Sequence, residues 1–356
     1  MRIALLANLK KNAPTWPGMP PDRWDDLDSE ETIQAILRAL EAGGHHAVFL
    51  EGDATLLDTV RQVKPDLCFN ICEGHFGDSR EAQVPALLEM LRIPYTGSQV
   101  LTLALTLDKP MTKRVLSYHG LPTPPFQVFE RLTEPLDPEL KFPLFVKPSR
   151  EGTGMGVSAE SIVHDEGQLR TQLARIFERY NQPVLVERFI EGREVTVGLI
   201  GNLRSPVAWR VPEDEEAPRI RKGLHFFPPL EVDMAAYPPE EAGIYTSRIK
   251  VEMAHDFHCL CPAPLSAGQV EELTWLTAAV FRVTGCLDVA RVDFRLDAHD
   301  GNKPYILEVN PLPGLNPGYS DLCLEAAADG WTYEQLINEI VNLAAERYGL
   351  NTCPTP

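Results

Sequence analysis

The first hundred residues alternate short apolar runs with segments whose apolar residues recur at helical spacing. Runs at 2–7, 47–52 and 66–71 are typical of strands, and helices are predicted at about 30–42, at 55–63 and from Arg80. Asp28 and Glu31 flank an expected capping box, and Gly43 and Gly44 end the first helix. Strands alternating with helices in this way predict an α/β fold with a parallel sheet. Residues 11–26, rich in proline and tryptophan, do not fit the pattern and are predicted to be a surface excursion.

Two further units follow, and their pattern is α+β. A helix from Lys109 to Gly120 leads to a strand at 142–148, a glycine-rich loop, a short strand at 157–161, a helix at about 165–180 and a strand at 183–189. The last unit has predicted strands at 194–201, 206–211, 288–296 and 304–310, and a helix after Trp331. Between them, 212–265 is poorly periodic and dense in Pro, Glu and Asp, which is typical of a functional loop or an insertion.

Composition limits the classes of protein to consider. The 356 residues exceed the roughly 250–300 at which a single core stops growing, so we expect two or three domains. A net charge of −18 argues against a nucleic-acid partner, which requires a basic face. The longest apolar runs, such as 100–107, are shorter than the roughly 18 residues of a membrane span, and the opening segment reads as a buried strand, not a signal peptide.

Cysteine usage favours a reducing compartment. Seven cysteines cannot all pair within the chain, so we expect reduced thiols in a cytoplasmic protein. The cluster His255, His258, Cys259 and Cys261 invites a metal interpretation, but its spacing is not that of a structural zinc site, and a loop with free thiols is favoured.

Lys147 is followed by Gly152, Gly154 and Gly156 in a glycine-rich loop, VKPSREGTGMGVS. Glycine lets backbone N–H groups approach an anion closely, and a lysine adds a point charge, so the segment is a candidate polyphosphate cradle. A glycine-rich turn that binds nothing is the alternative for this loop alone.

The segments DVARVDFRL and PYILEVN carry the second constellation. Alternation places Arg291 and Asp293 on one strand face, and Glu308 and Asn310 on one face of the other strand. If the strands pair, two carboxylates and an amide oxygen converge, and these are ligands that Mg²⁺ accepts beside nucleotide phosphates. The alternative is that these residues lie on two solvated strand faces, which can have the same sequence.

A third segment, VLVERFIEGREVTV, reads either as a strand and turn with solvated charges or as an adenine slot. In the second interpretation backbone groups after Glu187 contact the base, and Glu194 accepts hydrogen bonds from ribose hydroxyls.

In order and spacing, YTGSQVLTLALTLDKPMTK, VKPSREGTGMGVS, VLVERFIEGREVTV, GCLDVARVDFRLD and YILEVNPLPGL resemble the ATP-grasp superfamily, and within it the D-alanine:D-alanine ligases. The resemblance covers roughly residues 66–345. It implies a three-lobed ATP-grasp fold with a Rossmann-like parallel-sheet domain at 1–105, a central lobe at 106–189 and a C-terminal lobe at 190–350 with a mobile loop around 212–262. It also suggests a homodimer formed through the N-terminal lobe.

The resemblance assigns roles by position. Arg291 and the backbone N–H of Gly314 would stabilise an oxyanion, and Lys250 would be the mobile-loop lysine over the β- and γ-phosphates, although a solvated loop lysine is the alternative. Asp293, Glu308 and Asn310 would bind two Mg²⁺, with Mn²⁺ as a substitute. The ATP site would comprise Lys109, Lys147, Gly152, Thr153, Gly154, Met155, Gly156, Glu187, Arg188, Ile190 and Glu194. Glu73, Ser149 and Ser320 are candidate substrate contacts.

The implied chemistry is carboxylate–amine ligation of small amino-acid or peptide substrates. Phosphorylation by ATP converts a carboxylate into an acylphosphate that an amine can attack, so catalysis requires positioning and charge neutralisation. Water must be excluded from the acylphosphate, which gives the irregular region around Lys250 a role as a lid.

The amino-acid pockets depart from the family pattern. The family's Gly-Gly-x-Ser turn is replaced by ANLKKNAP, and only Glu30 or Glu31 could serve as its ammonium-binding glutamate. NICEGHFGDSRE replaces the usual acidic turn. Val251 follows Lys250 in place of an aromatic residue or histidine, and PLPGLNP follows Asn310. Because the ATP and metal motifs are intact, we expect a ligase for substrates other than two D-alanines. A cell-wall D-alanine:D-alanine ligase and a non-catalytic nucleotide-binding regulator remain the alternatives.

Overall fold

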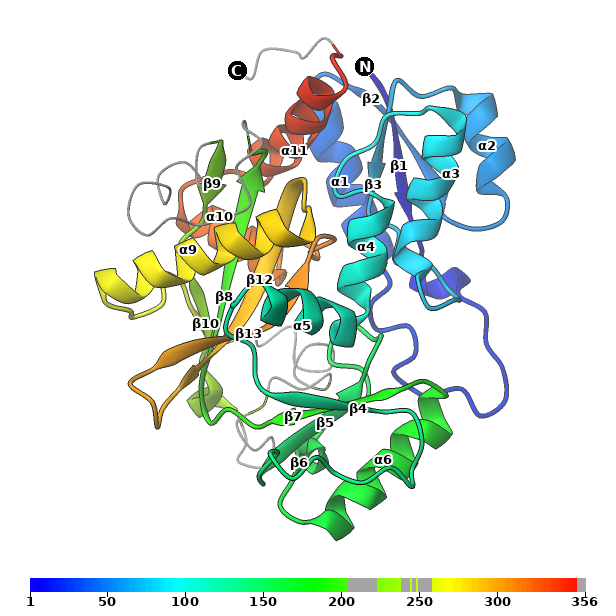
Figure 1. Ribbon diagram of the computed structural model, residues 1–356. Helices are drawn as coiled ribbons and strands as arrows, with labels where there is room; N and C mark the ends of the chain where they lie inside the picture. The colour runs from blue at the N-terminus through cyan, green and yellow to red at the C-terminus, as the bar shows by residue number, and fades with distance from the viewer. Residues whose placement is uncertain (204–222, 238–243, 245–247, 249–257, 351–356) are drawn as a thin grey trace.

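The computed structural model describes residues 1–203, 223–237, 244, 248 and 258–350 (Figure 1). Its first layer is the predicted parallel sheet, in the order β2-β1-β3. Alternate residues of β1 face opposite sides: Ile3 and Leu5 contact α1, whereas Ala4 and Leu6 contact α2 and α3. The bounds of these elements are β1 Arg2–Ala7, α1 Glu30–Ala42, β2 His46–Glu51, α2 Leu56–Val63, β3 Leu67–Asn70 and α3 Gln83–Leu91.

The start of α1 differs from the prediction. Its N-cap is Ser29, whose Oγ accepts a hydrogen bond from the Thr32 amide at 3.2 Å, so Asp28 lies one residue outside the helix. The Ser29 hydroxyl therefore satisfies the Thr32 amide, and the Asp28 side chain does not cap the helix.

The middle sheet is antiparallel, in the order β4-β7-β5-β6, and α6 covers one face (Figure 1). The strand predicted at 157–161 is wrong: a 3₁₀ helix, Ala159–Ser161, begins there, because Ser158 and Ser161 bond reciprocally to each other's backbone. The bounds are β4 Phe126–Phe129, β5 Leu144–Pro148, β6 Ile162–Val163, α6 Glu166–Tyr180 and β7 Val184–Arg188.

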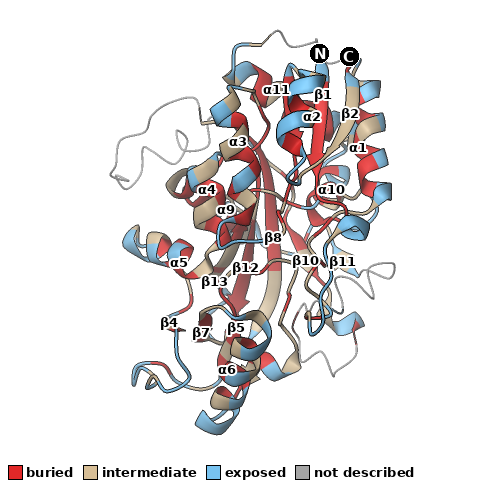
Figure 2. Cartoon of the chain, turned by 90° about the vertical axis from the view of Figure 1, so that its right-hand side faces the viewer, coloured by how far each residue is buried: buried red, intermediate tan, exposed pale blue. Residues whose placement is uncertain are grey.

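The third sheet is also antiparallel, in the order β11-β10-β8-β12-β13, with β9 beside β8. Figure 2 shows that β12 is buried along its length, beneath α9. The bounds are β8 Gly192–Gly201, β9 Leu224–Phe226, β10 Leu230–Val232, β11 Cys259–Leu260, α9 Ala267–Thr284, β12 Asp288–Asp297 and β13 Lys303–Asn310. The strand predicted at 206–211 lies outside the described residues.

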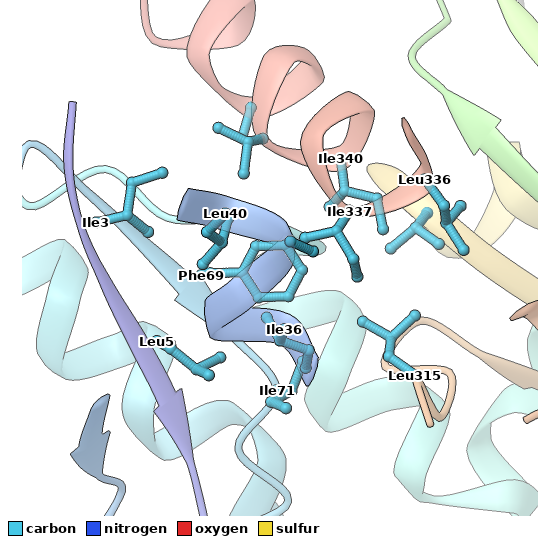
Figure 3. Close-up of a cluster of buried hydrophobic side chains, with 14 of the residues drawn as sticks. Ile3, Leu5, Ile36, Leu40, Phe69, Ile71, Leu315, Leu336, Ile337 and Ile340 are labelled. Carbon is cyan, nitrogen blue, oxygen red and sulfur yellow. The ribbon is translucent and has the colours of Figure 1, made fainter. Parts of the chain in front are cut away.

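Four more helices connect the layers: α4 Val100–Leu107, α5 Lys109–Tyr118, α10 Asp321–Ala328 and α11 Tyr333–Arg347. The C-terminal α11 returns to the first domain, where Leu336, Ile337 and Ile340 pack on Ile36 and Leu40 of α1 (Figure 3). No helix of the described part is both long enough and apolar enough to cross a bilayer.

Residues 11–28, which we call the strap, are not merely a surface excursion. Trp24 is only 5% exposed and donates from Nε1 to the Pro14 carbonyl at 2.9 Å. Its ring meets those of Trp16 and Phe76 at centroid distances of 5.9 and 6.0 Å. Aromatic burial holds the strap against the body of the protein although, beyond the 3₁₀ helix Lys10–Asn12, it forms no helix or strand.

A buried carboxylate joins α11 to the sheets. Asp288, fully buried at the start of β12, accepts hydrogen bonds from Arg347 Nη2 at 2.7 Å, from the Gly97 amide at 2.9 Å and from Asn202 Nδ2 at 2.8 Å. The ion pair between Asp288 and Arg347 therefore connects the last helix to the third sheet, and the Gly97 amide connects both to the first domain.

We expect Arg347→Met to lower the free energy of unfolding by about 3–5 kcal/mol, because it leaves Asp288 buried without a counter-charge. Urea denaturation measures this loss. Arg347→Lys keeps the positive charge but not the planar guanidinium group, so its free energy of unfolding should fall by less. Arg61→Met, at an exposed position, is the matched control. A loss below about 1 kcal/mol for Arg347→Met would contradict the assignment.

Candidate active site

A cavity lies between the middle sheet and the third sheet. Phe145, Met155, Phe189 and Leu307 form its apolar walls, and the rings of Phe145 and Phe189 are stacked 6.2 Å apart with planes inclined by 23°. Flat apolar walls of this kind suit an aromatic base. Of the predicted nucleotide-binding residues, Lys109, Lys147, Gly154, Met155, Glu187, Arg188, Ile190 and Glu194 all line this cavity.

Glu187 is buried between two lysines. Its carboxylate lies 2.8 Å from Lys147 Nζ and 2.7 Å from Nζ of Lys113, a residue that the sequence analysis missed. Lys113 also donates to Thr123 Oγ1 at 2.6 Å. The signal was present, because Lys113 follows Lys109 by four residues and such residues share a helix face.

Burial and pairing oppose each other in this group. Burial lowers the pKa of Lys113 to about 8, despite the attraction of Glu187. Burial also disfavours the charge of Lys147, but Glu187 and Glu308 outweigh it and raise its pKa. Burial opposes the Glu187 charge too, yet the two ammonium groups keep its pKa below the usual value. One carboxylate between two lysines leaves positive charge at the cavity, where an anion would be stabilised.

Some backbone amides of the glycine-rich loop already donate to acceptors within the protein and are not open to an anion. The Met155 amide donates to the Gly152 carbonyl at 2.9 Å, and the Gly156 amide donates to Asp22 Oδ2 of the strap at 2.8 Å. Gly156, predicted as a nucleotide contact, therefore directs its N–H to the strap and lines neither of the two cavities of the site. Within the described chain the amides of Thr153 and Gly154, which have φ of 51° and 72°, have no acceptor, like those of Glu151 and Gly152, and are available to an anion.

Gly156 is needed for a different reason. A Cβ there would lie 2.6 Å from Pro148 Cγ, and its φ is 74°. Asp22, the partner of its amide, also accepts from the Tyr180 hydroxyl at 2.7 Å. The strap thus ties the loop to helix α6 from outside the cavity.

The acidic strand ends converge as predicted. Asp293 of β12 lies opposite Glu308 of β13, and Asn310 Nδ2 is 3.0 Å from Asp293 Oδ2. Glu308 also lies 3.2 Å from Lys109 Nζ. Two carboxylates and an amide at one point are hard donors, so the donor set fits Mg²⁺.

Arg291 stands beside this group. It donates to both oxygens of Asp293 at 2.8 and 2.9 Å and lies 3.5 Å from Asp321. Burial opposes its charge, but the two carboxylates outweigh burial and raise its pKa. Asp321, which begins α10, was missed by the sequence analysis.

A second cavity, of about 890 Å³, contains Arg291 and Gly314 together with Lys109, Glu308 and Asn310. Gly152 and Thr153 also line it. Gly314 has no room for a side chain, because a Cβ would lie 2.9 Å from Ser320 Oγ. The predicted oxyanion residues and two of the three predicted metal ligands, Glu308 and Asn310, therefore border one space.

The predicted substrate residues divide into two groups. Glu73 and Ser320 line the larger cavity, and Ser320 Oγ accepts from the Asn316 amide at 2.9 Å. Ser149 is fully buried and lines neither of these cavities, so its prediction as a substrate contact is wrong; its carbonyl instead accepts from the Lys109 amide at 3.0 Å. Lys250 lies outside the described residues.

Arg295 is a further residue that the sequence analysis missed. It lies 3.2 Å from Glu194 and donates to the Ile190 carbonyl at 3.2 Å, so it orders two predicted nucleotide contacts. Arg188 points to Asp297 at 3.0 Å. Extending the alternation from Arg291 and Asp293 to Arg295 would have found it.

Arg80 links the strap to the glycine-rich loop. Its Nη2 lies 3.1 Å from Asp26 of the strap and 3.0 Å from Glu151 of the loop, and its Nη1 donates to the Arg150 carbonyl at 2.8 Å. Arg23 of the strap also contacts Glu151 at 2.8 Å. These partners are up to 71 residues apart in the sequence, so no local pattern signals them.

The metal interpretation of the His255–Cys261 cluster receives no support. Within the described chain no three His, Cys, Asp or Glu side chains are grouped to hold a metal ion, and Cys259 and Cys261 are free thiols. Cys259 lies in β11, not in a loop, and His255 is outside the described residues.

Comparison with known proteins agrees with this geometry. The family described as "D-ala D-ala ligase C-terminus" matches residues 115–215 and 232–342. A D-alanine–D-alanine ligase of Pelotomaculum thermopropionicum is 33% identical, over 90% of this chain and 93% of the relative. An uncharacterized protein, y4sG, of Sinorhizobium fredii is also 33% identical, over 98% of each chain.

A solved structure shows the same fold. The D-alanine–D-alanine ligase of Bacillus anthracis, complexed with ATP, superposes with a TM-score of 0.70 at 23% identity, over 98% of this chain and 99% of that chain. The strand pairing and the sequence identity lead to one assignment: the chain belongs to the D-alanine–D-alanine ligase family and is an ATP-dependent ligase of the ATP-grasp fold that forms carbon–nitrogen bonds.

Proposed function

We propose that this protein joins two amino acids or small peptides by an amide bond through an acylphosphate, releasing ADP and phosphate, and that its substrates are not the standard pair of D-alanines. The observation that carries the proposal is the shared cavity: Arg291 and Gly314 face the same space as Lys109 and Glu308. An acyl group and a transferred phosphate can therefore meet there.

The smaller cavity is the proposed ATP site. Lys147 and Lys109 would neutralise phosphate charge, the Thr153 and Gly154 amides would donate to phosphate oxygens, and the Phe145 and Phe189 rings would enclose the base. Asp293, Glu308 and Asn310 would hold two Mg²⁺, or Mn²⁺ in their place. When bound, these ions supply charge neutralisation between the phosphates.

The protein's part in the reaction is to orient and to neutralise. The substrate carboxylate accepts the γ-phosphoryl group and ADP leaves. The amine nitrogen then bonds to the carbonyl carbon, and the C–O bond to phosphate breaks. Arg291 and the Gly314 amide would hold the oxyanion of the tetrahedral intermediate.

The identity of the substrates rests on the departures in the amino-acid pocket. Asp321 and the strap border the larger cavity, and the Gly-Gly-x-Ser turn of the family is absent from the sequence. An ordinary D-alanine:D-alanine ligase is the second candidate, since it would use the same nucleotide chemistry. The family resemblance is also the basis for expecting a homodimer through the N-terminal lobe and a lid role for Lys250.

Turnover tests these candidates directly. The protein is supplied with ATP, Mg²⁺ and either D-alanine or pools of other amino acids and short peptides, while ADP, phosphate and product mass are measured. ADP formation with the pools beyond that with D-alanine supports the proposal, whereas preference for D-alanine identifies the second candidate. AMP with pyrophosphate contradicts an acylphosphate, and absence of ADP throughout contradicts ligase activity.

We expect Arg291→Ala to lower kcat by at least about 10²-fold while the ATP dissociation constant changes little, because Arg291 would act on the oxyanion and not on the nucleotide. Steady-state kinetics and calorimetry with a non-hydrolysable ATP analogue separate the two effects. Arg175→Ala, on the surface beside Glu160, is the matched control. Near-normal turnover would show that the oxyanion role is misassigned.

We expect Tyr180→Phe and Asp22→Asn to weaken ATP binding about three- to tenfold, because each removes a hydrogen bond that holds the glycine-rich loop. The double variant should lose less than the sum of the two, since Asp22 and Tyr180 are partners. Tyr118→Phe, at an exposed site, is the control. Unchanged ATP affinity in both variants would mean that the strap does not position the loop.

A further inference from the structure

The larger cavity is strongly acidic along the part of its wall that belongs to the first domain and the strap. Carboxylates outnumber cationic side chains in its lining, where the cations are Lys10, Lys109 and Arg291. Each of those cations already has a carboxylate partner: Asp25 at 2.8 Å, Glu308 at 3.2 Å and Asp293 at 2.8 Å, respectively. The cavity therefore carries negative charge that its own cations do not balance.

Four lining carboxylates form no ion pair within the described chain: Asp28, Glu31, Glu73 and Glu81. We call them the acidic wall. Glu31 is exposed, whereas the other three are half-buried. Glu81 and Asp28 disfavour the charge of Glu73, and Arg80 offsets part of this effect. Such a group is costly to maintain unless a cation reaches it.

The titration of the wall shows the same cost. Burial raises the pKa of Asp28 to about 7, with Asp26 adding to the effect. Burial also raises the pKa of Glu81 to about 7 and places that of Glu73 well above its usual value. Strongly perturbed carboxyls in a cleft are typical of functional sites.

Asp26 supplies an independent observation. Its side chain is 6% exposed and its Oδ2 is held by Arg80, but its buried Oδ1, in the same cavity lining, has no hydrogen-bond partner. A buried acceptor left open at a cavity indicates a donor that arrives with a ligand. In the described part of the chain no three His, Cys, Asp or Glu side chains are grouped around this oxygen to hold a metal ion, so an organic cation suits the position better.

The direction of the substrate in the cavity follows from the reaction. Its carboxylate must reach Arg291, the Gly314 amide and the phosphate end marked by Lys109. The remainder of the molecule then extends into the rest of the same cavity, where the first domain and the strap supply the lining. A single α-ammonium brings one positive charge to a wall of four carboxyl groups. Because burial raises the pKa of three of them, ionising them in the unliganded cavity is costly, and a second positive charge would stabilise their ionised forms.

We propose that the acidic wall binds a second cationic group of the acyl-donating substrate, so that this substrate is a basic amino acid of the lysine, ornithine or arginine class. The inference rests on the proposed ligase function. It adds a charge requirement that the reaction itself does not impose, and the two can fail separately.

Matched substrates test the charge requirement. Substrate-dependent ADP release is compared for lysine with norleucine and for arginine with citrulline, in both D and L forms, with ATP, Mg²⁺ and a pool of amine acceptors. We expect kcat/KM for the charged member to exceed that of its neutral partner at least tenfold. Binding of the same pairs in the presence of a non-hydrolysable ATP analogue gives a readout that needs no turnover.

Variants then locate the preference. Glu73→Gln and Asp28→Asn should each reduce the charged-to-neutral ratio of kcat/KM at least threefold. Two positions are used so that a folding failure at one leaves the other informative. Glu41→Gln is the matched control, because Glu41 is exposed near the end of α1 and does not line the cavity.

The outcomes separate the two proposals. ADP release with neutral amino acids at equal or greater efficiency overturns the charge requirement and leaves the ligase function standing. Absence of ADP with every substrate overturns the ligase function; if binding then shows no preference for the charged members, it overturns the charge requirement as well. A preference that survives both variants overturns the assignment to the acidic wall.

Discussion

The placement of Glu187 between Lys113 and Lys147 is the interaction on which the nucleotide end of the site depends. One carboxylate cannot cancel two ammonium groups, so the buried group stays positive and suits an anion. The same contact fixes helix α5 to strands β5 and β7. Because Lys109 is one helical turn before Lys113, fixing Lys113 also directs Lys109 toward Glu308. Phosphate charge and metal ligands are thereby placed together.

The strap has the corresponding role at the other side of the glycine-rich loop. Asp22 takes the Gly156 amide, and Arg80 joins Asp26 to Glu151, so the loop is held from the first domain as well as from its own sheet. Removal of Arg80 would leave the buried Asp26 carboxylate without a counter-charge and Glu151 with Arg23 alone, which is far costlier than the loss of a surface pair. The loop is therefore positioned by the part of the chain that also forms the substrate cavity.

The features that the sequence predicted correctly are those that depend on patterns over a few neighbouring residues. The alternation in β1 and the spacing in α1 predicted the parallel layer, and the period of two along β12 and β13 predicted that Asp293 and Glu308 would meet. Those signals are local. The pairing of Arg80 with Glu151 joins residues 71 apart, and the strap has aromatic and proline residues without a period, so neither could be read from a pattern. Ser149 was misplaced because β5 ends at Pro148, so the alternation that directs Lys147 into the cavity does not extend to Ser149.

The net charge of the chain does not describe the charges that line its two cavities. A net charge of −18 describes a surface that repels polyanions, yet Lys109 and Lys147 line the smaller cavity, and Lys113 lies behind it against Glu187. The larger cavity has cations at its reaction end and carboxylates along the wall formed by the first domain and the strap. A zwitterion in such a field has one favoured direction, with its carboxylate toward Arg291 and its positive end toward Asp28 and Glu73. Orientation of the acyl donor can therefore come from the charge distribution, and the shape of the pocket is left to select the side chain.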